Sequence, residues 1–397
     1  MDRKKNIPQI RFQNYEDEWV YSTIGRHISL LNGRAYKQEE LLDEGKYRVL
    51  RVGNFNTNSK WYYSNLELED NKYVNKGDLL YLWATNFGPE IWTEEKAIYH
   101  YHIWKLEFDK TDINQDYLYI WLESDKNKIQ QNTNGSTMVH ITKNMMEERR
   151  ISLPTQDEQS AIGSLFRTLD DLLASYKDNL ANYQSLKATM LSKMFPKAGQ
   201  TVPEIRLDGF EGEWEVVSLG TLIENYDEII SGASGFPIAT SSRKGLYLQN
   251  DYFEGGRTGI DLTLDFHRVP MGYVTYRHMS DDSIFKFNKN NFETDVLVSK
   301  EYPVFISNDS SDIDFLLYHL NNSRLFLRFS TMQKLGGTRV RLYYKNLITY
   351  KLAVPTLKEQ QAIGAYFSNL DNLIAAHQEK ISQLETLKKK LLQDMFI

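Results

Sequence analysis

Apolar residues recur at alternating spacings of three and four positions in two stretches of the chain, residues 157–195 and 358–396. That spacing aligns apolar side chains along one stripe of an α-helix. A Thr-x-x-Glu box, typical of a helix N-terminus, opens each stretch at Thr155 and Thr356. We therefore predict two long helices. In each, the Thr hydroxyl accepts a hydrogen bond from the backbone amide three residues later, and the side chain of Glu158 or Glu359 accepts one from the backbone amide of the Thr. The stripes are Ile162, Phe166, Leu169, Leu173, Tyr176, Leu180, Tyr183, Met190 and Met194, and Ile363, Phe367, Leu370, Ile374, His377, Ile381, Leu384, Leu391 and Met395.

The two stretches belong to a long internal repeat. From Leu153 and Val354 onward the copies match at a constant offset of 201 positions. Solenoid units are only ~20–50 residues long, so the chain is one large module used twice. A shorter motif, here called the opening motif, precedes each body at an offset of 195 positions. Its residues are Pro8, Ile10, Arg11, Trp19 and Gly25 in the first module, and Pro203, Ile205, Arg206, Trp214 and Gly220 in the second.

Each apolar stripe needs a partner. A long helix could lie on its own domain, or the two helices could pair with each other. Equal length, equal phase and equal caps favour mutual pairing, and a two-fold relation between the modules would make the helices antiparallel. Lys187 and Lys388 interrupt the stripes at matching positions, as polar residues do when they set the register of a coiled coil. We expect the pair to act as a spacer between the two bodies.

The bodies combine strand and helix patterns, which predicts an α+β fold. Segments rich in β-branched and aromatic residues favour strands at 48–52, 78–83, 99–106 and 273–277. Apolar spacing favours helices at 116–124 and 313–327. The predicted domains are body one at 1–152, a spacer helix at 153–200, body two at 201–353, and a second spacer helix at 354–397.

Composition narrows the class of protein. The chain of 397 residues contains no cysteine, which excludes disulfides and thiolate chemistry and suits a cytoplasmic protein. The first residues carry no apolar run typical of a signal peptide, and no apolar stretch approaches the ~20 residues that span a bilayer. A net charge of −6 argues mildly against nucleic-acid binding, so the distribution of charge matters more than its sum.

One basic, glycine-containing stretch precedes each long helix. Residues 315–353 contain seven Lys or Arg residues and no acid, and residues 126–146 are likewise free of acid. Glycine turns let backbone amides approach phosphates, and arginines neutralise phosphates or fork onto guanine. A solvated basic loop without a ligand is the alternative. The candidate DNA contacts are Arg324, Arg328, Lys334, Gly336, Gly337, Thr338, Arg339, Arg341 and Lys345 in body two, and Asn134, Gly135, Ser136, Thr137, His140 and Lys143 in body one.

Further candidates lie in polar turns beside strands, where ordinary surface polarity is the alternative for each. They are Arg34, Lys37, Arg51, Asn54, Arg243, Lys244 and Arg277.

Motifs for catalysis are missing from the sequence. Amino-methylation of a base uses an Asn/Asp-Pro-Pro-aromatic loop, and no two prolines are adjacent. No Gly-x4-Gly-Lys-Ser/Thr phosphate loop occurs. The acidic cluster at 89–96 is too short for a nuclease site, and His100-x-His102 lacks an evident third metal ligand. We therefore predict neither a catalytic nor a metal site.

The repeated helix, with Pro154-Thr155-x-x-Glu158-Gln159 at its start, and the paired opening motif resemble the conserved regions of type I restriction–modification specificity subunits. Lys76-Gly77-Asp78-Leu79-Leu80 is similar to a strand start common in that family's target-recognition domains, whereas body two has Met271-Gly272-Tyr273-Val274 in the nearest position. The resemblance covers the whole chain.

The resemblance implies two target-recognition domains held apart by two antiparallel helices, each domain reading one half of a bipartite DNA site. It implies that the helix pair sets the spacing and docks two modification subunits, which carry S-adenosylmethionine. Two restriction subunits would add ATP- and Mg-dependent translocation and cleavage, and no cofactor would bind this chain. The rival hypotheses are a fused methyltransferase or nuclease, and a coiled-coil scaffold that does not contact DNA.

Overall fold

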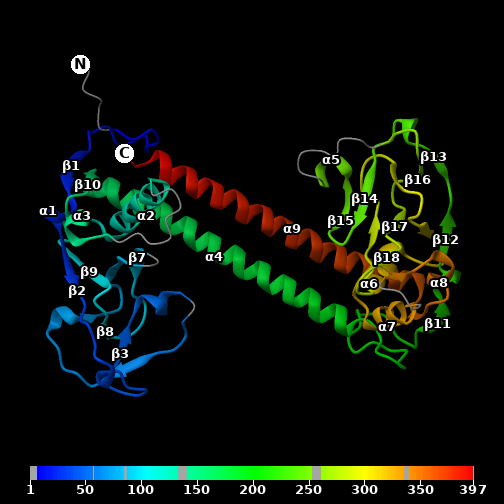
Figure 1. Cartoon of the computed structure of the whole chain (residues 1–397), viewed down its shortest axis with the longest axis horizontal. Coiled ribbons are helices and arrows are strands. Elements are labelled where there is room, and N and C mark those ends of the chain that lie inside the picture. The colour runs from blue at the N-terminus through cyan, green and yellow to red at the C-terminus, as the bar shows by residue number, and fades with distance from the viewer. Residues whose placement is uncertain are drawn as a thin grey trace. The chain divides into compact units, whose positions relative to one another are not determined.

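The computed structural model describes residues 7–56, 58–84, 87–132, 141–252, 261–334 and 339–396. The chain divides into two compact units: unit 1 comprises Met1–Lys177 and Glu379–Ile397, and unit 2 comprises Asp178–Gln378. Both divisions fall inside long helices, α4 (Gln156–Lys193) and α9 (Leu357–Asp394), labelled in Figure 1. Each unit therefore holds one body, the first part of that body's own long helix and the last part of the other long helix.

Unit 1 combines mainly antiparallel sheets with helices, and the α+β prediction is confirmed. Its sheets have the strand orders β2-β9-β6-β7, β4-β3-β8-β5 and β1-β10. Its described strands are β1 (Val20–Thr23), β2 (Ile28–Asn32), β3 (Tyr47–Leu50), β4 (Tyr62–Ser64), β5 (Tyr73–Val74), β6 (Leu79–Leu82), β7 (Gly88–Ile91), β8 (Ala97–Tyr99), β9 (Ile103–Phe108) and β10 (Arg150–Leu153). Its shorter α-helices are α1 (Ile24–His27), α2 (Gln115–Asn132) and α3 (Lys143–Glu147).

Unit 2 has a different set of sheets. Their strand orders are β12-β21-β17-β19, β13-β16-β20, β14-β15, β18-β22 and β11-β23. The described strands are β11 (Glu215–Ser218), β12 (Ile223–Tyr226), β13 (Ile229–Ser231), β14 (Ala239–Ser242), β15 (Gly245–Leu248), β16 (Asp265–Val269), β17 (Val274–Tyr276), β18 (Met279–Ser280), β19 (Phe287–Lys289), β20 (Val296–Ser299), β21 (Val304–Ser307), β22 (Val340–Arg341) and β23 (Lys351–Val354). The shorter α-helices are α5 (Gln249–Tyr252), α6 (Ile313–Asn322), α7 (Arg324–Met332) and α8 (Tyr344–Leu347).

One two-stranded sheet is common to both units. In unit 1, β1 lies between Trp19 and Gly25 of the opening motif and pairs antiparallel with β10, with Val20 opposite Leu153. In unit 2, β11 pairs with β23 in the same way, with Glu215 opposite Val354. The strand that enters each body thus pairs with the strand that leaves it for the long helix, so the conserved frame closes around a variable body.

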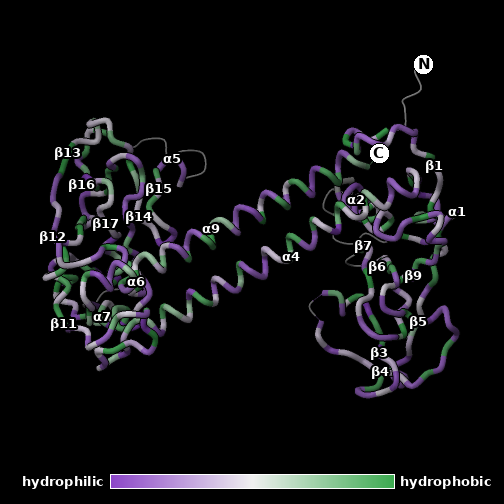
Figure 2. Tube along the Cα trace, turned by 180° about the vertical axis from the view of Figure 1, so that it is seen from behind, coloured by the Kyte–Doolittle hydropathy of each residue, from purple (hydrophilic) through white to green (hydrophobic). Residues whose placement is uncertain are grey.

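The long helices pair antiparallel within each unit, as predicted. In unit 1, Asp170 contacts Lys388 while Lys177 lies 2.7 Å from Glu385. Residue numbers therefore increase along one helix in the direction in which they decrease along the other. In unit 2 the corresponding contact joins Lys187 and Asp371. The predicted stripe residues are buried or half-buried, whereas most residues between them are exposed. Figure 2 shows hydrophobic and hydrophilic positions alternating along both helices, as a seam on one face requires.

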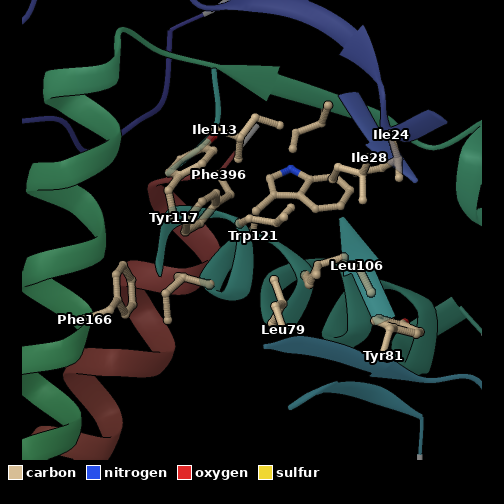
Figure 3. Close-up of a cluster of buried hydrophobic side chains, with 14 of the residues drawn as sticks. Ile24, Ile28, Leu79, Tyr81, Leu106, Ile113, Tyr117, Trp121, Phe166 and Phe396 are labelled. Atoms are coloured by element: carbon tan, nitrogen blue, oxygen red, sulfur yellow. The ribbon is translucent and has the colours of Figure 1, made fainter. Parts of the chain in front are cut away.

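The core of unit 1 joins the body to both long helices. Figure 3 shows Tyr117 and Trp121 of α2 near Phe166 of α4 and Phe396 at the end of the chain. The ring centroids of Tyr117 and Phe396 are 5.8 Å apart, and those of Phe166 and Phe396 are 6.1 Å apart. In unit 2, Phe195 packs in the same way on Phe367, with centroids 6.2 Å apart. Each long helix therefore ends in the core of the other module.

Two predicted elements differ from the structure. The helix predicted at 313–327 is two helices, because Ser323 adopts an extended conformation and its hydroxyl accepts from the amides of Leu325 and Phe326. The strand predicted at 99–106 is also two strands, since residues 100–102 form a turn between β8 and β9. His100 and His102 consequently lie in a turn and not on one strand face. The helix predicted at 116–124 is confirmed within α2.

Candidate nucleic-acid interface

The opening motif clamps the start of each long helix. The Arg11 guanidinium donates to both carboxylate oxygens of Glu158, over 2.7 and 2.8 Å, and Trp19 Nε1 donates to the same carboxylate over 3.2 Å. The side chain of Glu158 is fully buried. The Thr155 hydroxyl accepts from the Glu158 amide at 3.4 Å, as predicted. The prediction that the Glu158 carboxylate caps the helix was wrong, because the buried carboxylate pairs with the guanidinium.

The second module repeats the arginine–glutamate pair of this clamp, whereas the buried Trp214 Nε1 finds no hydrogen-bond partner among the described residues. Arg206 donates to both oxygens of Glu359 over 2.8 and 2.7 Å, and the Glu359 side chain is only 1% exposed. The backbone beside each arginine holds the end of the other long helix. The Ile10 amide donates to the Asp394 carbonyl over 3.1 Å, and the Ile205 amide donates to the Lys193 carbonyl over 3.0 Å. Each opening motif therefore fixes the start of one helix and the end of the other.

The next conserved residues dock each long helix on a helix of the body. Gln159 accepts from the Asn114 amide over 2.8 Å, and Gln360 accepts from the Asp312 amide over 3.0 Å. Gly163 lets α4 approach α2, since a Cβ there would lie 2.7 Å from the Asp116 Cβ. The Glu, Gln and Gly residues at these repeat positions thus have structural roles.

Lys187 and Lys388, predicted to set the register, form reciprocal ion pairs. Lys388 pairs with Asp170 in unit 1, and Lys187 pairs with Asp371 in unit 2. The same two residues of the repeat therefore form the same contact twice, with donor and acceptor exchanged between the helices. This pairing favours one antiparallel register.

Four described basic candidates of body two lie on helices and a strand: Arg324 and Arg328 on α7, Arg341 on β22 and Lys345 on α8. The side chains of Arg324, Arg328, Arg341 and Lys345 are exposed, and no described carboxylate lies within 4.0 Å of their charged atoms. Lys334 is exposed as well. Gly336, Gly337 and Thr338 lie outside the described residues.

Two other arginines of body two are paired. Arg339 donates to Asp281 over 2.8 Å, and Arg243 forms a two-pronged contact with Asp282. The stretch 315–353 is free of acid in sequence, but the fold brings Asp281 to its Arg339, while Asp282 pairs with Arg243 outside the stretch. The Arg243 guanidinium lowers the pKa of Asp282 to about 2, so this carboxylate stays charged. Arg277 and Arg341 lie close enough to His278 to help lower its pKa, after the larger effect of burial.

In body one, Arg51 lies beside an aromatic turn that the sequence analysis treated as a strand and not as a candidate DNA contact. Arg51 lies over the Tyr62 ring, 4.3 Å from its centroid, and contributes to lowering the pKa of His100. Burial is the larger cause, and the pKa of His100 falls to about 4, so this imidazole is neutral at pH 7. Tyr101 is 39% exposed and packs beside Trp83, with centroids 6.1 Å apart. The clustering of aromatic residues at 99–104 was the available signal.

The remaining body-one candidates hold local structure. Arg34 donates to both oxygens of Glu40, while Lys37 is exposed. The Asn54 side chain accepts from the Arg51 amide over 3.0 Å and so shapes its own turn. Lys143 lies 3.6 Å from Glu147 on α3. Asn134, Gly135, Ser136, Thr137 and His140 lie outside the described residues.

Metal binding and membrane insertion find no support in the described parts of the chain. No group of three or more His, Asp or Glu side chains there could hold a metal ion. None of the helices in those parts is long and apolar enough to cross a bilayer.

Comparison with known proteins decides the family. The model of the type I restriction modification DNA specificity domain matches residues 16–182 and 244–386, which is more than half of the chain and covers a large part of each module. The chain belongs to this family of specificity subunits. It is similar to the type I restriction enzyme MjaVIII specificity subunit of Methanocaldococcus jannaschii, with 23% identity over 98% of this chain and 95% of the relative. The EcoBI specificity subunit of Escherichia coli is 24% identical over 43% of this chain and 35% of the relative.

A solved structure shares the fold. The S subunit of a type I restriction–modification system from M. genitalium superimposes with a TM-score of 0.60 at 15% identity, covering 98% of this chain and 99% of that chain. The specificity subunit family accounts for the doubled module, for recognition of DNA as the role of the chain, and for its place in a larger complex.

Proposed function

We propose that each body reads one half of a bipartite DNA site and that the two long helices set the distance between the half-sites. The functional division is residues 1–152 and 201–353 for reading, and 153–200 and 354–397 for spacing. The helices would also dock two modification subunits, to which two restriction subunits would attach. The names of the relatives support the place in such a complex.

The observation that carries this proposal is a constant frame around two different bodies. The arginine–glutamate pair, the docking glutamine and the lysine–aspartate pair of the long helices recur at equivalent positions of the two modules. An example is Arg11–Glu158 in the first module and Arg206–Glu359 in the second. The sheets inside the frame differ in strand number and order. A shared frame supports a shared attachment and a shared spacing, whereas different bodies support two different half-sites.

The reading surfaces would combine phosphate and base contacts. In body two, the exposed and unpaired Arg324, Arg328, Arg341 and Lys345 are available to DNA. In body one, Arg51 and the aromatic turn around Tyr101 offer a cation and rings beside a neutral His100. Losing a phosphate contact would weaken binding to all sequences, whereas losing a base contact would relax one position of the site by ~1–3 kcal/mol.

Catalysis would belong to the partners. The modification subunits would bring S-adenosylmethionine and the restriction subunits ATP and Mg, and this chain would bind no cofactor. Partners that share the phosphate contacts would also explain how a chain of net charge −6 handles DNA. Incubating the purified chain alone with DNA and labelled S-adenosylmethionine tests this point. We expect no transfer of label, and turnover without partners would favour a fused enzyme.

Exchanging body one for that of a relative distinguishes a role in reading DNA from a role as a scaffold that does not contact DNA. Replacing residues 26–149 with the corresponding body of a relative keeps the opening motif, β10 and both long helices. We expect one half of the methylated motif to change while the other half and the gap stay the same. An unchanged motif would favour a scaffold that does not contact DNA.

A further inference from the structure

A groove of about 520 Å³ in unit 2 runs between body two and the long helices. One wall comes from the helices and the other from the β14–β15 hairpin, the segment leading into β19, and α6. Four lysines and two carboxylates line it: Lys187, Lys244, Lys286, Lys289, Asp314 and Asp371.

Two of these lysines are already neutralised. Lys187 pairs with Asp371, whose second oxygen accepts from the Tyr318 hydroxyl over 2.8 Å. Lys289 donates to both oxygens of Asp314 over 2.9 and 3.0 Å. Among the described residues, no carboxylate lies within 4.0 Å of the amines of Lys244 and Lys286. The groove therefore has a net positive charge from these two lysines.

Lys286 is held where a charged amine is costly without an anion. Its side chain is half-buried in the groove, and burial lowers its pKa, with a further lowering by Lys187. Desolvation disfavours the ammonium form, whereas an anion within contact distance favours it. The fold has already removed part of the water around this amine, so a bound anion would interact with it more strongly than with a fully hydrated amine.

The backbone that carries both lysines is braced. The Asn288 side-chain amide donates to the Ser241 hydroxyl over 2.8 Å and to the Ser242 carbonyl over 2.9 Å, which ties β19 to the hairpin bearing Lys244. Asn321 accepts from the Phe287 amide over 2.9 Å and donates to its carbonyl over 3.0 Å, which fixes the residue after Lys286 to α6. Because less ordering is then needed on binding, such a site binds more tightly than a loose one.

We propose that this groove binds a phosphate of the DNA backbone through Lys244 and Lys286. The inference rests on the proposed function, and adds a phosphate contact of body two that lies next to the spacer helices. The corresponding groove of unit 1 is lined by four lysines and three carboxylates, which leaves one net positive charge against two here, so the proposal concerns unit 2 alone.

The test uses the full chain assembled with its modification subunits. Fluorescence anisotropy measures the dissociation constant for duplexes with and without the methylated motif, over a series of salt concentrations. Each lost phosphate contact makes the slope of log affinity against log salt shallower by about 0.9. For Lys286→Ala we expect that change, with an equal loss of affinity for both duplexes and an unchanged methylated motif. Lys286→Arg should bind like the wild type.

Two further variants keep the result interpretable. Lys244→Ala changes an exposed residue on a hairpin, so it leaves the core intact and should give the same shallower slope. Lys300→Ala removes an exposed lysine that does not line the groove and should leave the slope unchanged. A wild-type slope for both Lys286→Ala and Lys244→Ala would overturn the inference, as would an affinity loss confined to the motif duplex. A wild-type complex with no motif preference would instead overturn the proposed function.

Discussion

Replacing Glu158 by Gln should loosen unit 1 and leave unit 2 unchanged. The carboxylate is fully buried and accepts two hydrogen bonds from Arg11, whose side chain is only 10% exposed. Gln has the same shape but no charge, and its amide nitrogen would face the donors of the guanidinium. The variant therefore leaves a nearly buried Arg11 charge without compensation, which costs about 3–5 kcal/mol when one partner of a buried pair is removed.

Hydrogen exchange measures this loss unit by unit. A free-energy loss of about 3–5 kcal/mol for opening raises the exchange of protected amides by roughly two to four orders of magnitude. We expect that increase in α2 and in the first part of α4, with α6 and α7 exchanging as in the wild type. Glu359→Gln is the matched variant and should do the reverse, because it breaks the Arg206 pair of unit 2.

A double replacement separates the charge from the packing. Changing Arg11 to Met and Glu158 to Leu removes both charges, and such apolar replacements of buried pairs are often neutral or stabilising. We expect the double variant to recover most of the protection lost by Glu158→Gln. If Glu158→Gln exchanged within threefold of the wild type throughout unit 1, the clamp would not hold the helix as argued.

Three further outcomes are expected. Gly163→Ala should destabilise unit 1 by about 1–3 kcal/mol in chemical unfolding, because its Cβ would lie 2.7 Å from the Asp116 Cβ. Burial lowers the pKa of His319 to about 4, so the unfolded chain takes up the proton at a higher pH than the folded chain does. The free energy of unfolding of unit 2 should therefore fall by up to roughly 3 kcal/mol as pH falls from about 6.5 to 4. His319→Gln should remove this part of the pH dependence of stability measured by urea unfolding. Inserting seven residues into both α4 and α9 should lengthen the spacer by ~10 Å and widen the gap in the methylated motif by about three base pairs. Insertion into α4 alone would shift the Lys187–Asp371 pair out of register and reduce complex assembly.

The parts of the fold that could be predicted were those with a periodic signal repeated twice. The apolar stripes indicated both long helices, and their equal phase indicated the antiparallel pairing that Asp170–Lys388 and Lys187–Asp371 display. Strand segments were found from composition, but their pairings were not, because partners such as β1 and β10 are separated by more than a hundred residues. The break at Ser323 was missed since the apolar spacing continues through it.

The misread residues share one cause, which is that local rules were applied to side chains with distant partners. Glu158 satisfies the sequence rule for a capping box, yet its carboxylate pairs with Arg11, 147 positions away. The acid-free stretch 315–353 likewise meets Asp281 in the fold, where this carboxylate accepts from Arg339. Lys187, Lys244 and Lys286 are scattered in the sequence, so only the folded chain brings them to one groove.

Methylome sequencing of cells that express this chain with its modification subunit tests the central claim most directly. The account predicts one bipartite motif, with two specific and unlike half-sites separated by a gap of constant length and undefined sequence. A continuous motif without such a gap, or methylation that does not depend on this chain, would contradict it.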